Sequence, residues 1–238
     1  MADGADRALW EDAVRRAQAA RVIVVLLMMP AGIASAQNRR PFLDVFLALA
    51  DVRSGMTVAD VGAGNGDFAF RLADAVGPGG RVYANEISPE NLAQIERRKQ
   101  ERSLNQVTVV SGGESDPKLP GPVDRITMID VYHHLTKPAD FLAALRKALK
   151  PGGRLLVAAV VNQRNPEAKP STSKMHDACV SDPDDTRKAI EQAGFVFETL
   201  VLHDDPSRSY FWPTSYALVF RAVETATSRR PAVQAEQR

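Results

Sequence analysis

A glycine-rich stretch that directly follows an apolar segment constrains the fold of this chain more than any other feature. Residues 56–61 have the apolar character of a buried strand, and glycines follow at Gly62, Gly64 and Gly66. Glycine permits a sharp turn and a close approach of the backbone to a ligand, and the helix that comes next offers free N–H groups in its first turn. The stretch therefore predicts a strand, a loop and a helix that together hold a nucleoside and its charged substituent.

The segments that follow predict a doubly wound α/β fold with a mostly parallel sheet. Strands are expected at 56–61, 81–86, 107–110, 125–131, 154–161, 196–202 and 216–222. Helices are expected at 41–52, 67–76, 89–102, 139–149 and 184–192. Because strands and helices alternate, right-handed crossovers would bring the strands into one sheet that helices cover on both faces. The first helix is expected on an edge of this sheet.

Composition limits the number of domains and the classes of function. A chain of 238 residues with 45% hydrophobic content can bury one good-sized core, which predicts one domain with extended ends. Lys and Arg together number 30 and Asp and Glu 29, so no broad basic face is available for a phosphate backbone, and nucleic acid is not expected as a partner. The single cysteine, Cys179, excludes an internal disulfide and a multi-thiolate metal site, and no metal is expected.

The first 36 residues have the layout of a secretory signal. A basic segment ends at Arg21, an apolar run follows over residues 22–33, and Ala34-Ser35-Ala36 supplies the small side chains that a signal peptidase prefers. We therefore expect cleavage after Ala36 and a periplasmic or secreted protein. The alternatives are an uncleaved anchor in the inner membrane, which would give membrane association through the N-terminus, and a cytoplasmic protein in which the apolar run is buried.

Two further segments lie outside the alternating pattern. Residues 162–182 are polar and longer than a routine connection, which predicts a mobile lid beside the binding site. The C-terminal tail is polar and poor in large apolar residues, so we expect it to be disordered. The resulting boundaries are 1–36 for the signal sequence or anchor, 37–224 for the globular domain and 225–238 for the tail.

A carboxylate at the end of the second expected strand supports the nucleoside hypothesis. Glu86 stands where its side chain can accept hydrogen bonds from both hydroxyls of a ribose, at a suitable separation from the glycine loop. A dinucleotide-binding loop would place its third glycine one position later, where this chain has Asp67. An NAD-dependent oxidoreductase is therefore the weaker alternative.

Over residues 41–223 the chain resembles the class I methyltransferases that use S-adenosylmethionine (SAM). The matching segments are Val-Ala-Asp-Val-Gly-Ala-Gly-Asn-Gly (58–66), Val-Tyr-Ala-Asn-Glu (82–86), Asp-Val-Tyr-His-His-Leu (130–135) and Leu-Lys-Pro-Gly-Gly-Arg-Leu (149–155). The chain is particularly similar to a group of bacterial methyltransferase-like proteins that begin with signal sequences and carry the same Asp-Val-Tyr-His-His segment. The resemblance implies a Rossmann-like, seven-stranded sheet whose last strand is antiparallel, with SAM as the cofactor. Because SAM is made in the cytoplasm, an exported enzyme would need a supply of SAM outside it.

The resemblance also implies roles for individual residues. Asp60 would lie near the methionine part of SAM, the glycine loop would wrap the cofactor, and Glu86 would hold the ribose. Asp130 would border the methionine tail and the entrance for the acceptor. Many relatives bind the adenine amino group with an acidic residue after the third strand, and here Glu114 and Asp116 are both candidates. The expected cofactor-binding residues are Asp60, Gly62, Ala63, Gly64, Gly66, Glu86, Glu114 and Asp130.

Tyr132, His133 and His134 are the candidate catalytic residues on the acceptor side. Histidine titrates near neutral pH and could take a proton from an oxygen or nitrogen acceptor as the methyl group moves. The alternative is that either histidine only shapes the pocket. A catalytic base is not obligatory, since methyl transfer from a sulfonium needs chiefly in-line positioning and desolvation.

Together these features predict a SAM-dependent methyltransferase that acts on a small-molecule acceptor, whose identity the sequence does not indicate. The alternative from another class is a SAM-binding sensor or scaffold module without turnover, because an intact binding loop predicts binding and not catalysis. Arsenic methylation is disfavoured by the single cysteine. The sequence has no Asn-Pro-Pro-Tyr/Phe stretch, which disfavours methylation of amino groups in adenine or glutamine. The sequence gives no indication of the oligomeric state.

Overall fold

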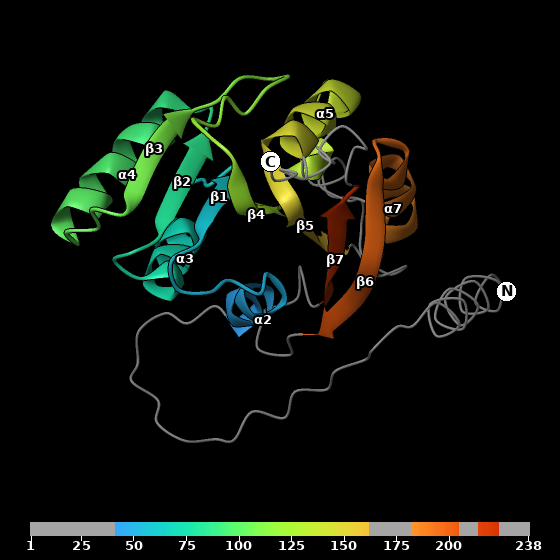
Figure 1. Cartoon of the computed structure of the whole chain (residues 1–238), viewed down its shortest axis with the longest axis horizontal. Coiled ribbons are helices and arrows are strands. Elements are labelled where there is room, and N and C mark those ends of the chain that lie inside the picture. The colour runs from blue at the N-terminus through green and yellow to red at the C-terminus, as the bar shows by residue number, and fades with distance from the viewer. Residues whose placement is uncertain (1–40, 162–181, 205–213, 224–238) are drawn as a thin grey trace, which may run out of the picture.

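Seven strands form one sheet in the order β3-β2-β1-β4-β5-β7-β6 (Figure 1). The computed structural model describes residues 41–161, 182–204 and 214–223. The strands are β1 (Thr57–Val61), β2 (Arg81–Glu86), β3 (Val107–Ser111), β4 (Val123–Ile129), β5 (Leu149–Val161), β6 (Phe195–Asp204) and β7 (Thr214–Ala222). Strands β1 to β5 run parallel, and β7 inserts between β5 and β6, antiparallel to both. The predicted doubly wound sheet with an antiparallel last strand is confirmed.

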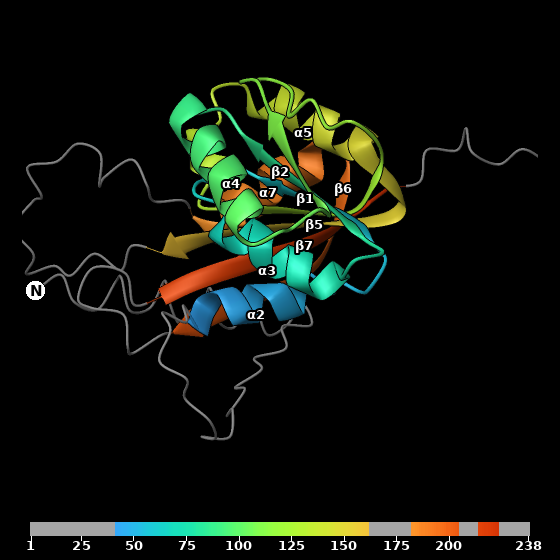
Figure 2. The ribbon, with the colours of Figure 1, turned by 90° about the vertical axis from the view of Figure 1, so that its left-hand side faces the viewer.

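Helices cover both faces of the sheet. They are α2 (Pro41–Leu49), α3 (Asp67–Val76), α4 (Pro89–Glu101), α5 (Pro138–Ala148) and α7 (Pro183–Gln192), with a short 3-10 helix η1 (Tyr132–His134) after β4. One apolar core joins α2, α3 and α4 to one face, and a second joins α5 and α7 to the other. Figure 2 shows α2 and α3 below the sheet and α5 above it. Because both faces are covered, the interior strand β1 is almost wholly buried.

Helix α2 is shorter than the predicted helix 41–52 and does not lie on an edge of the sheet. It packs against α3, β5 and β7, whereas the edge strands are β3 and β6. Small side chains account for this position, because Ala158 of β5 and Ala217 of β7 leave room above the face for Leu43 and Phe46 of α2. All four side chains are buried, so α2 is part of the core.

Strand β5 begins earlier than the sequence predicted. Its first residue, Leu149, already pairs with Val123 of β4, although the Pro-Gly-Gly stretch at 151–153 indicates a turn. The register shifts between Val123 and Arg125, so the extra residues of β5 are accommodated as an irregularity in the ladder. The turn signal therefore marks a bulge inside a strand and not the end of an element.

No helix in the described part of the chain is long and apolar enough to cross a membrane. The predicted signal sequence at 1–36 and the predicted tail at 225–238 lie outside the described residues. The same holds for all but the last residue of the predicted lid at 162–182. These three assignments stay predictions.

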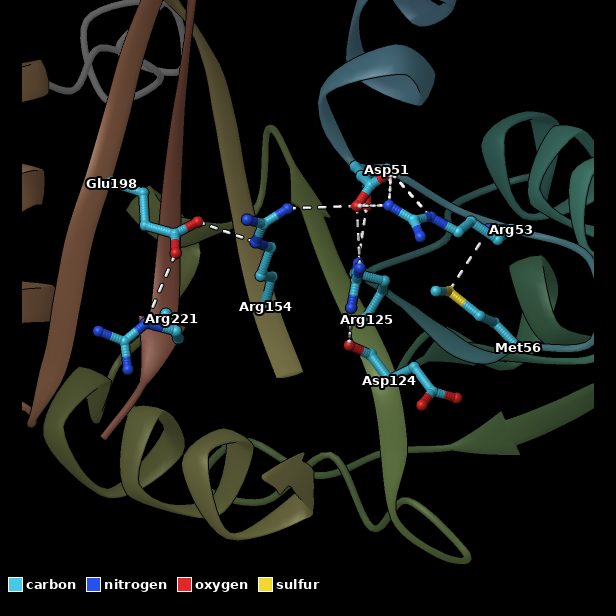
Figure 3. A network of polar contacts seen from close by, with 9 residues as sticks. Asp51, Arg53, Met56, Asp124, Arg125, Arg154, Glu198 and Arg221 are labelled. Carbon is cyan, nitrogen blue, oxygen red and sulfur yellow. Dashed lines mark hydrogen bonds and ion pairs between the residues drawn. The ribbon is translucent and has the colours of Figure 1, made fainter. Parts of the chain in front are cut away.

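A network of arginines and carboxylates joins α2 to the sheet at the edge where the parallel strands begin (Figure 3). Oδ2 of Asp51, which follows α2, accepts hydrogen bonds from Arg125 of β4 at 3.1 Å and from Arg154 of β5 at 3.2 Å. Arg53 contacts the other carboxylate oxygen at 3.2 Å, and Arg154 also pairs with Glu198 of β6 at 2.9 Å. The network therefore links the end of α2 to three strands.

Asp51→Ala is expected to destabilise the fold far more than Arg53→Ala. The backbone at Asp51 has φ 47°, which an alanine adopts at a cost, and the substitution leaves Arg125, whose side chain is only 11% exposed, without its carboxylate partner. We expect the free energy of unfolding, measured by urea denaturation, to fall by about 2–3 kcal/mol. Arg53 is 71% exposed, so its removal should cost less than about 0.5 kcal/mol. Equal losses in the two variants would contradict the linking role of Asp51.

Candidate functional site

Two cavities open at the carboxyl edge of the sheet, where ligands bind in open α/β folds. The larger, of about 350 Å³, is lined by Val61, Gly62, Asn85, Glu86, Ile87, Gly113, Glu114, Asp130, Val131, His134, Leu135, Thr136 and Phe141. The smaller, of about 180 Å³, is lined by Leu43, Asp60, Gly62, Ala63, Gly64, Asn65, Asp67, Phe68, Ile129 and Asp130. Because Gly62 and Asp130 line both cavities, the two meet where β1 and β4 end.

The glycine loop between β1 and α3 adopts a conformation that side chains rarely permit. Gly62, Gly64 and Gly66 have φ values of 71°, 54° and 88°. A Cβ at Gly62 would lie 2.3 Å from a methyl group of Val131, and one at Gly66 would lie 2.9 Å from the ring of Phe70. At Gly64 a Cβ would meet no atom within 4 Å, and Gly64 lines the smaller cavity. The first and last glycines are therefore needed for packing, whereas Gly64 leaves space for a ligand.

Glu86 fixes this loop to the end of β2. Its Oε2 accepts a hydrogen bond from the backbone N–H of Gly64 at 2.8 Å. Its Oε1 accepts from the N–H groups of Ile87 at 2.7 Å and Ser88 at 3.0 Å. A carboxylate has about four acceptor positions, so three backbone bonds leave capacity for a ligand hydroxyl. The side chain is 8% exposed and lines the larger cavity, as expected for a residue that holds a ribose.

Asp60 lies at the end of β1, beneath the first turn of α3. Its Oδ1 accepts a hydrogen bond from the Thr127 hydroxyl at 2.9 Å, and its carboxylate also accepts from the backbone N–H of Ala69. The N-cap of α3 is Gly66, which has no side chain, so Asp60 supplies the capping carboxylate from another element. Burial raises the pKa of Asp60 to about 7, and the negative charge of Glu86 acts in the same direction.

Asp130 occupies the point where the two cavities meet. Its φ is 56°, a left-handed conformation that aspartate tolerates better than most residues. The backbone N–H of Asp130 donates to the carbonyl of Ala158 at 2.8 Å, which holds the end of β4 against β5. The predicted position of Asp130 beside the expected methionine site is therefore compatible with the geometry.

The loop after β3 brings Glu114 to the larger cavity. Asn85, which is 2% exposed, donates from Nδ2 to the carbonyl of Pro117 at 2.6 Å and thereby ties this loop to β2. A Cβ at Gly112 would lie 2.7 Å from the same nitrogen, so the loop can approach Asn85 only because it has glycine there. Asp116 accepts from the N–H of Lys118 at 2.7 Å and does not line either cavity. Of the two acids left open by the sequence, Glu114 is the one placed at the cavity.

The candidate catalytic residues on η1 lie in different surroundings. His134 is exposed and lines the larger cavity. Both ring nitrogens of His133 are buried and have no hydrogen-bond partner among the described residues, and the two imidazole centroids are 4.0 Å apart. Burial, and then the neighbouring His134, lower the pKa of His133 to about 4, so its ring is neutral at pH 7. Tyr132 packs against the second core, where burial and then Tyr216 raise its pKa. The structure therefore brings only His134 to the described cavities.

Several residues of the site were not predicted from the sequence, among them Thr127, Asn85 and Ile87. Thr127 and Asn85 are polar side chains inside buried strands, and such residues are a usable signal because burial without a hydrogen bond is costly. Ile87 is a large apolar side chain that is 61% exposed at the mouth of the larger cavity. No periodic pattern marks Ile87, because it stands directly after the strand.

Comparison with known proteins agrees with this geometry. The methyltransferase-domain family matches residues 52–194, and the chain belongs to this family. The nocamycin O-methyltransferase of Saccharothrix syringae is 30% identical over 83% of this chain and 81% of its own length. The ubiquinone/menaquinone biosynthesis C-methyltransferase UbiE of Bordetella avium is 34% identical over 58% of this chain. The match covers 52% of that relative, so this chain spans about half of its length. A SAM-dependent methyltransferase from Aquifex aeolicus has the same fold, with a TM-score of 0.63 and 24% identity over 76% of this chain and 89% of its own.

Asp60→Asn is expected to make stability less dependent on pH. The folded state holds a proton on Asp60 up to about pH 7, whereas the unfolded chain releases it near the ordinary value of 3.8, so this group lowers stability as pH rises between these values. An asparagine cannot titrate and can still accept from Thr127. Between pH 4 and pH 8, the free energy of unfolding of the variant, measured by chemical denaturation, should therefore rise by on the order of 4 kcal/mol relative to that of the native chain.

Asp124 supplies a control of opposite sign. Burial opposes its charge, but hydrogen bonds from Lys150 and from the N–H of Thr57 outweigh burial and hold the pKa of Asp124 below its ordinary value. Asp124→Asn should therefore lose stability relative to the native chain as pH rises to about 4, and the difference should stay constant at higher pH. Parallel pH profiles for the native chain and Asp60→Asn would contradict the buried, protonated carboxyl.

Proposed function

We propose that this chain is a SAM-dependent methyltransferase that transfers a methyl group to a small-molecule acceptor. The observation that carries the proposal is the pair of cavities that meet at Gly62 and Asp130. SAM consists of an adenosine and a methionine half joined at the sulfonium that bears the methyl group. A larger and a smaller cavity with one junction match a ligand of this construction.

The residues around the larger cavity fit the adenosine half. Glu86 has acceptor capacity for ribose hydroxyls, and Glu114 can accept from the adenine amino group. Ile87 and Leu135 offer apolar side chains as walls for a flat base, together with Phe141. The volume of about 350 Å³ is in the range of small-molecule sites.

The smaller cavity fits the methionine half. Asp60 and Asp67 lie in its wall beside the backbone of the glycine loop, and Leu43 of α2 and Phe68 of α3 contribute apolar surface. The methionine end of SAM carries an ammonium group and a carboxylate. Asp60 can bind the ammonium, whose positive charge favours the ionised form of this carboxyl group, and the N-terminal end of α3 favours the carboxylate of the ligand.

The chemistry that the bound cofactor supplies is an electrophilic methyl group on a positively charged sulfur. The chain has to hold that methyl group in line with an acceptor atom and exclude water, and these tasks need no metal. His134 lines the larger cavity, whereas both ring nitrogens of His133 are buried and that ring is neutral at pH 7. We therefore assign to His134 the removal of a proton from the acceptor, and to His133 the support of the short helix that carries His134. A non-catalytic SAM sensor remains the alternative function, and turnover distinguishes the two.

Binding of SAM or S-adenosylhomocysteine (SAH) should stabilise the native chain and not Gly64→Leu. At 100 times the dissociation constant, ligand adds about 2.7 kcal/mol, which raises the melting temperature by several degrees. Gly55→Leu is the matched control, because Gly55 also has a positive φ, of 82°, and open space around its Cβ, but lies outside both cavities. Both variants should lose similar intrinsic stability. Absence of any shift in the native chain at millimolar SAM or SAH would refute the proposed function, and an undiminished shift in Gly64→Leu would refute the assigned loop.

Label transfer from methyl-labelled SAM into a small-molecule extract should depend on His134. We expect His134→Asn to lower turnover about 100-fold while SAH affinity changes little, because a lost base affects the proton transfer and not cofactor binding. His133→Asn should lower turnover less, because its ring nitrogens do not reach the cavity. With the pKa of His133 near 4, turnover should not fall between pH 8 and pH 5.5 through protonation of this ring. Full turnover in His134→Asn would exclude a role as base, and SAH binding without any label transfer by the native chain would favour the sensor.

A further inference from the structure

The guanidinium group of Arg98, on α4, reaches across to the glycine loop. Its Nη1 donates to the backbone carbonyl of Asn65 at 2.5 Å, and its Nη2 donates to Oδ1 of Asp67 at 2.8 Å. The same guanidinium stacks on the ring of Phe70, with 5.0 Å between its Cζ and the ring centroid. Arg98 therefore contacts the last part of the loop and the first turn of α3 with one planar group.

These contacts hold the second end of a peptide plane whose first end is held by a single backbone hydrogen bond. The carbonyl of Asn65 and the N–H of Gly66 belong to one peptide plane, and the N–H of Gly66 donates to the carbonyl of Ala63 at 2.8 Å. Rotation of this plane changes ψ of Asn65 and φ of Gly66, and glycine permits many φ values, so the plane could flip if only the bond to Ala63 held it. Arg98 holds the opposite end of the plane. At the same time it neutralises Asp67, whose N–H is bound by Oδ1 of Asn65 at 3.1 Å.

We propose that Arg98 is a positioning residue that keeps the glycine loop in the conformation that binds the amino-acid half of the cofactor. The inference rests on the proposed function, because it concerns the same site. Asn65 and Asp67 line the smaller cavity and are absent from the wall of the larger one. Loss of Arg98 therefore affects the methionine end, while Glu86 still holds Gly64 and the adenosine side.

Arg102, one turn further along the chain, is a matched control for Arg98. It stacks on the same Phe70 ring, with 5.1 Å between its Cζ and the ring centroid, and pairs with Asp74 of α3 at 3.4 Å. Both arginines thus contribute a guanidinium to one aromatic ring and an ion pair to one helix. Only Arg98 has a hydrogen bond to the loop. A comparison of Arg98→Ala with Arg102→Ala therefore isolates the loop contact from general packing of α4.

The test measures the affinity of the full chain for SAH and for 5′-methylthioadenosine, which lacks the amino-acid part, by isothermal titration calorimetry. If Arg98→Ala leaves the loop competent about a tenth of the time, the dissociation constant for SAH rises about tenfold. The value for 5′-methylthioadenosine should stay unchanged, and Arg102→Ala should leave both values unchanged. Arg98→Lys, which keeps the charge and the alkyl stem over Phe70, should recover little of the loss, because one ammonium does not reproduce the fork geometry of the guanidinium. Arg98→Lys also serves as the folded variant if Arg98→Ala does not fold.

Each result tests a different part of the proposal. Binding of SAH by the native chain with equal affinity in Arg98→Ala, or in Arg98→Lys where Arg98→Ala does not fold, would overturn the role of Arg98. An equal loss for SAH and 5′-methylthioadenosine would also overturn it, because it would indicate general loosening. An equal loss in Arg98→Ala and Arg102→Ala would show that packing on Phe70 matters and the loop contact does not. If the native chain binds neither ligand, the proposed function fails first.

Discussion

The hydrogen bond between the Glu86 carboxylate and the N–H of Gly64 is the contact on which the rest of the site depends. Strands β1 and β2 are paired in parallel up to Val61 and Asn85, so their ends lie side by side, and Glu86 is the next residue. One oxygen binds the loop after β1 and the other binds the turn after β2. A single buried side chain thus sets the relative positions of the two segments that enclose the larger cavity.

The distribution of charge follows from the same parallel arrangement. Asp60, Glu86, Glu114 and Asp130 all line the cavities at the carboxyl ends of strands. Burial raises the pKa of Asp60 to about 7, and the nearby negative charge of Glu86 acts in the same direction. Such an edge favours a ligand that brings positive charge, and the proposed cofactor is a cation. The arginine network around Asp51 lies at the opposite edge, where it joins α2 to the sheet without contact with either cavity.

The local chemistry of the chain was sufficient to predict most elements. Strand β2 and helix α3 have the predicted bounds. The turn at 77–80 ends α3 and precedes β2, and the acidic residue Glu86 marks the end of β2. The place of α2 was predicted wrongly, since periodicity shows that one side of a helix is apolar but not which surface covers it. The start of β5 was also missed, because Pro-Gly-Gly has the same sequence signature in a turn and in a bulge. In both cases the deciding contact is with a distant segment.

The sequence by itself determined the alternating fold, the glycine loop with Glu86, and the family to which the chain belongs. These properties are local, because they depend on backbone freedom at glycine and on side chains next to strand ends. Only the tertiary structure decided that Glu114 and not Asp116 reaches the cavity, that His134 lines it while the ring nitrogens of His133 are buried, and that Arg98 donates a hydrogen bond to the loop. Such choices depend on contacts between residues that are 20 or more positions apart in the sequence. The packing of whole elements sets these contacts, and packing leaves no pattern at the residue itself.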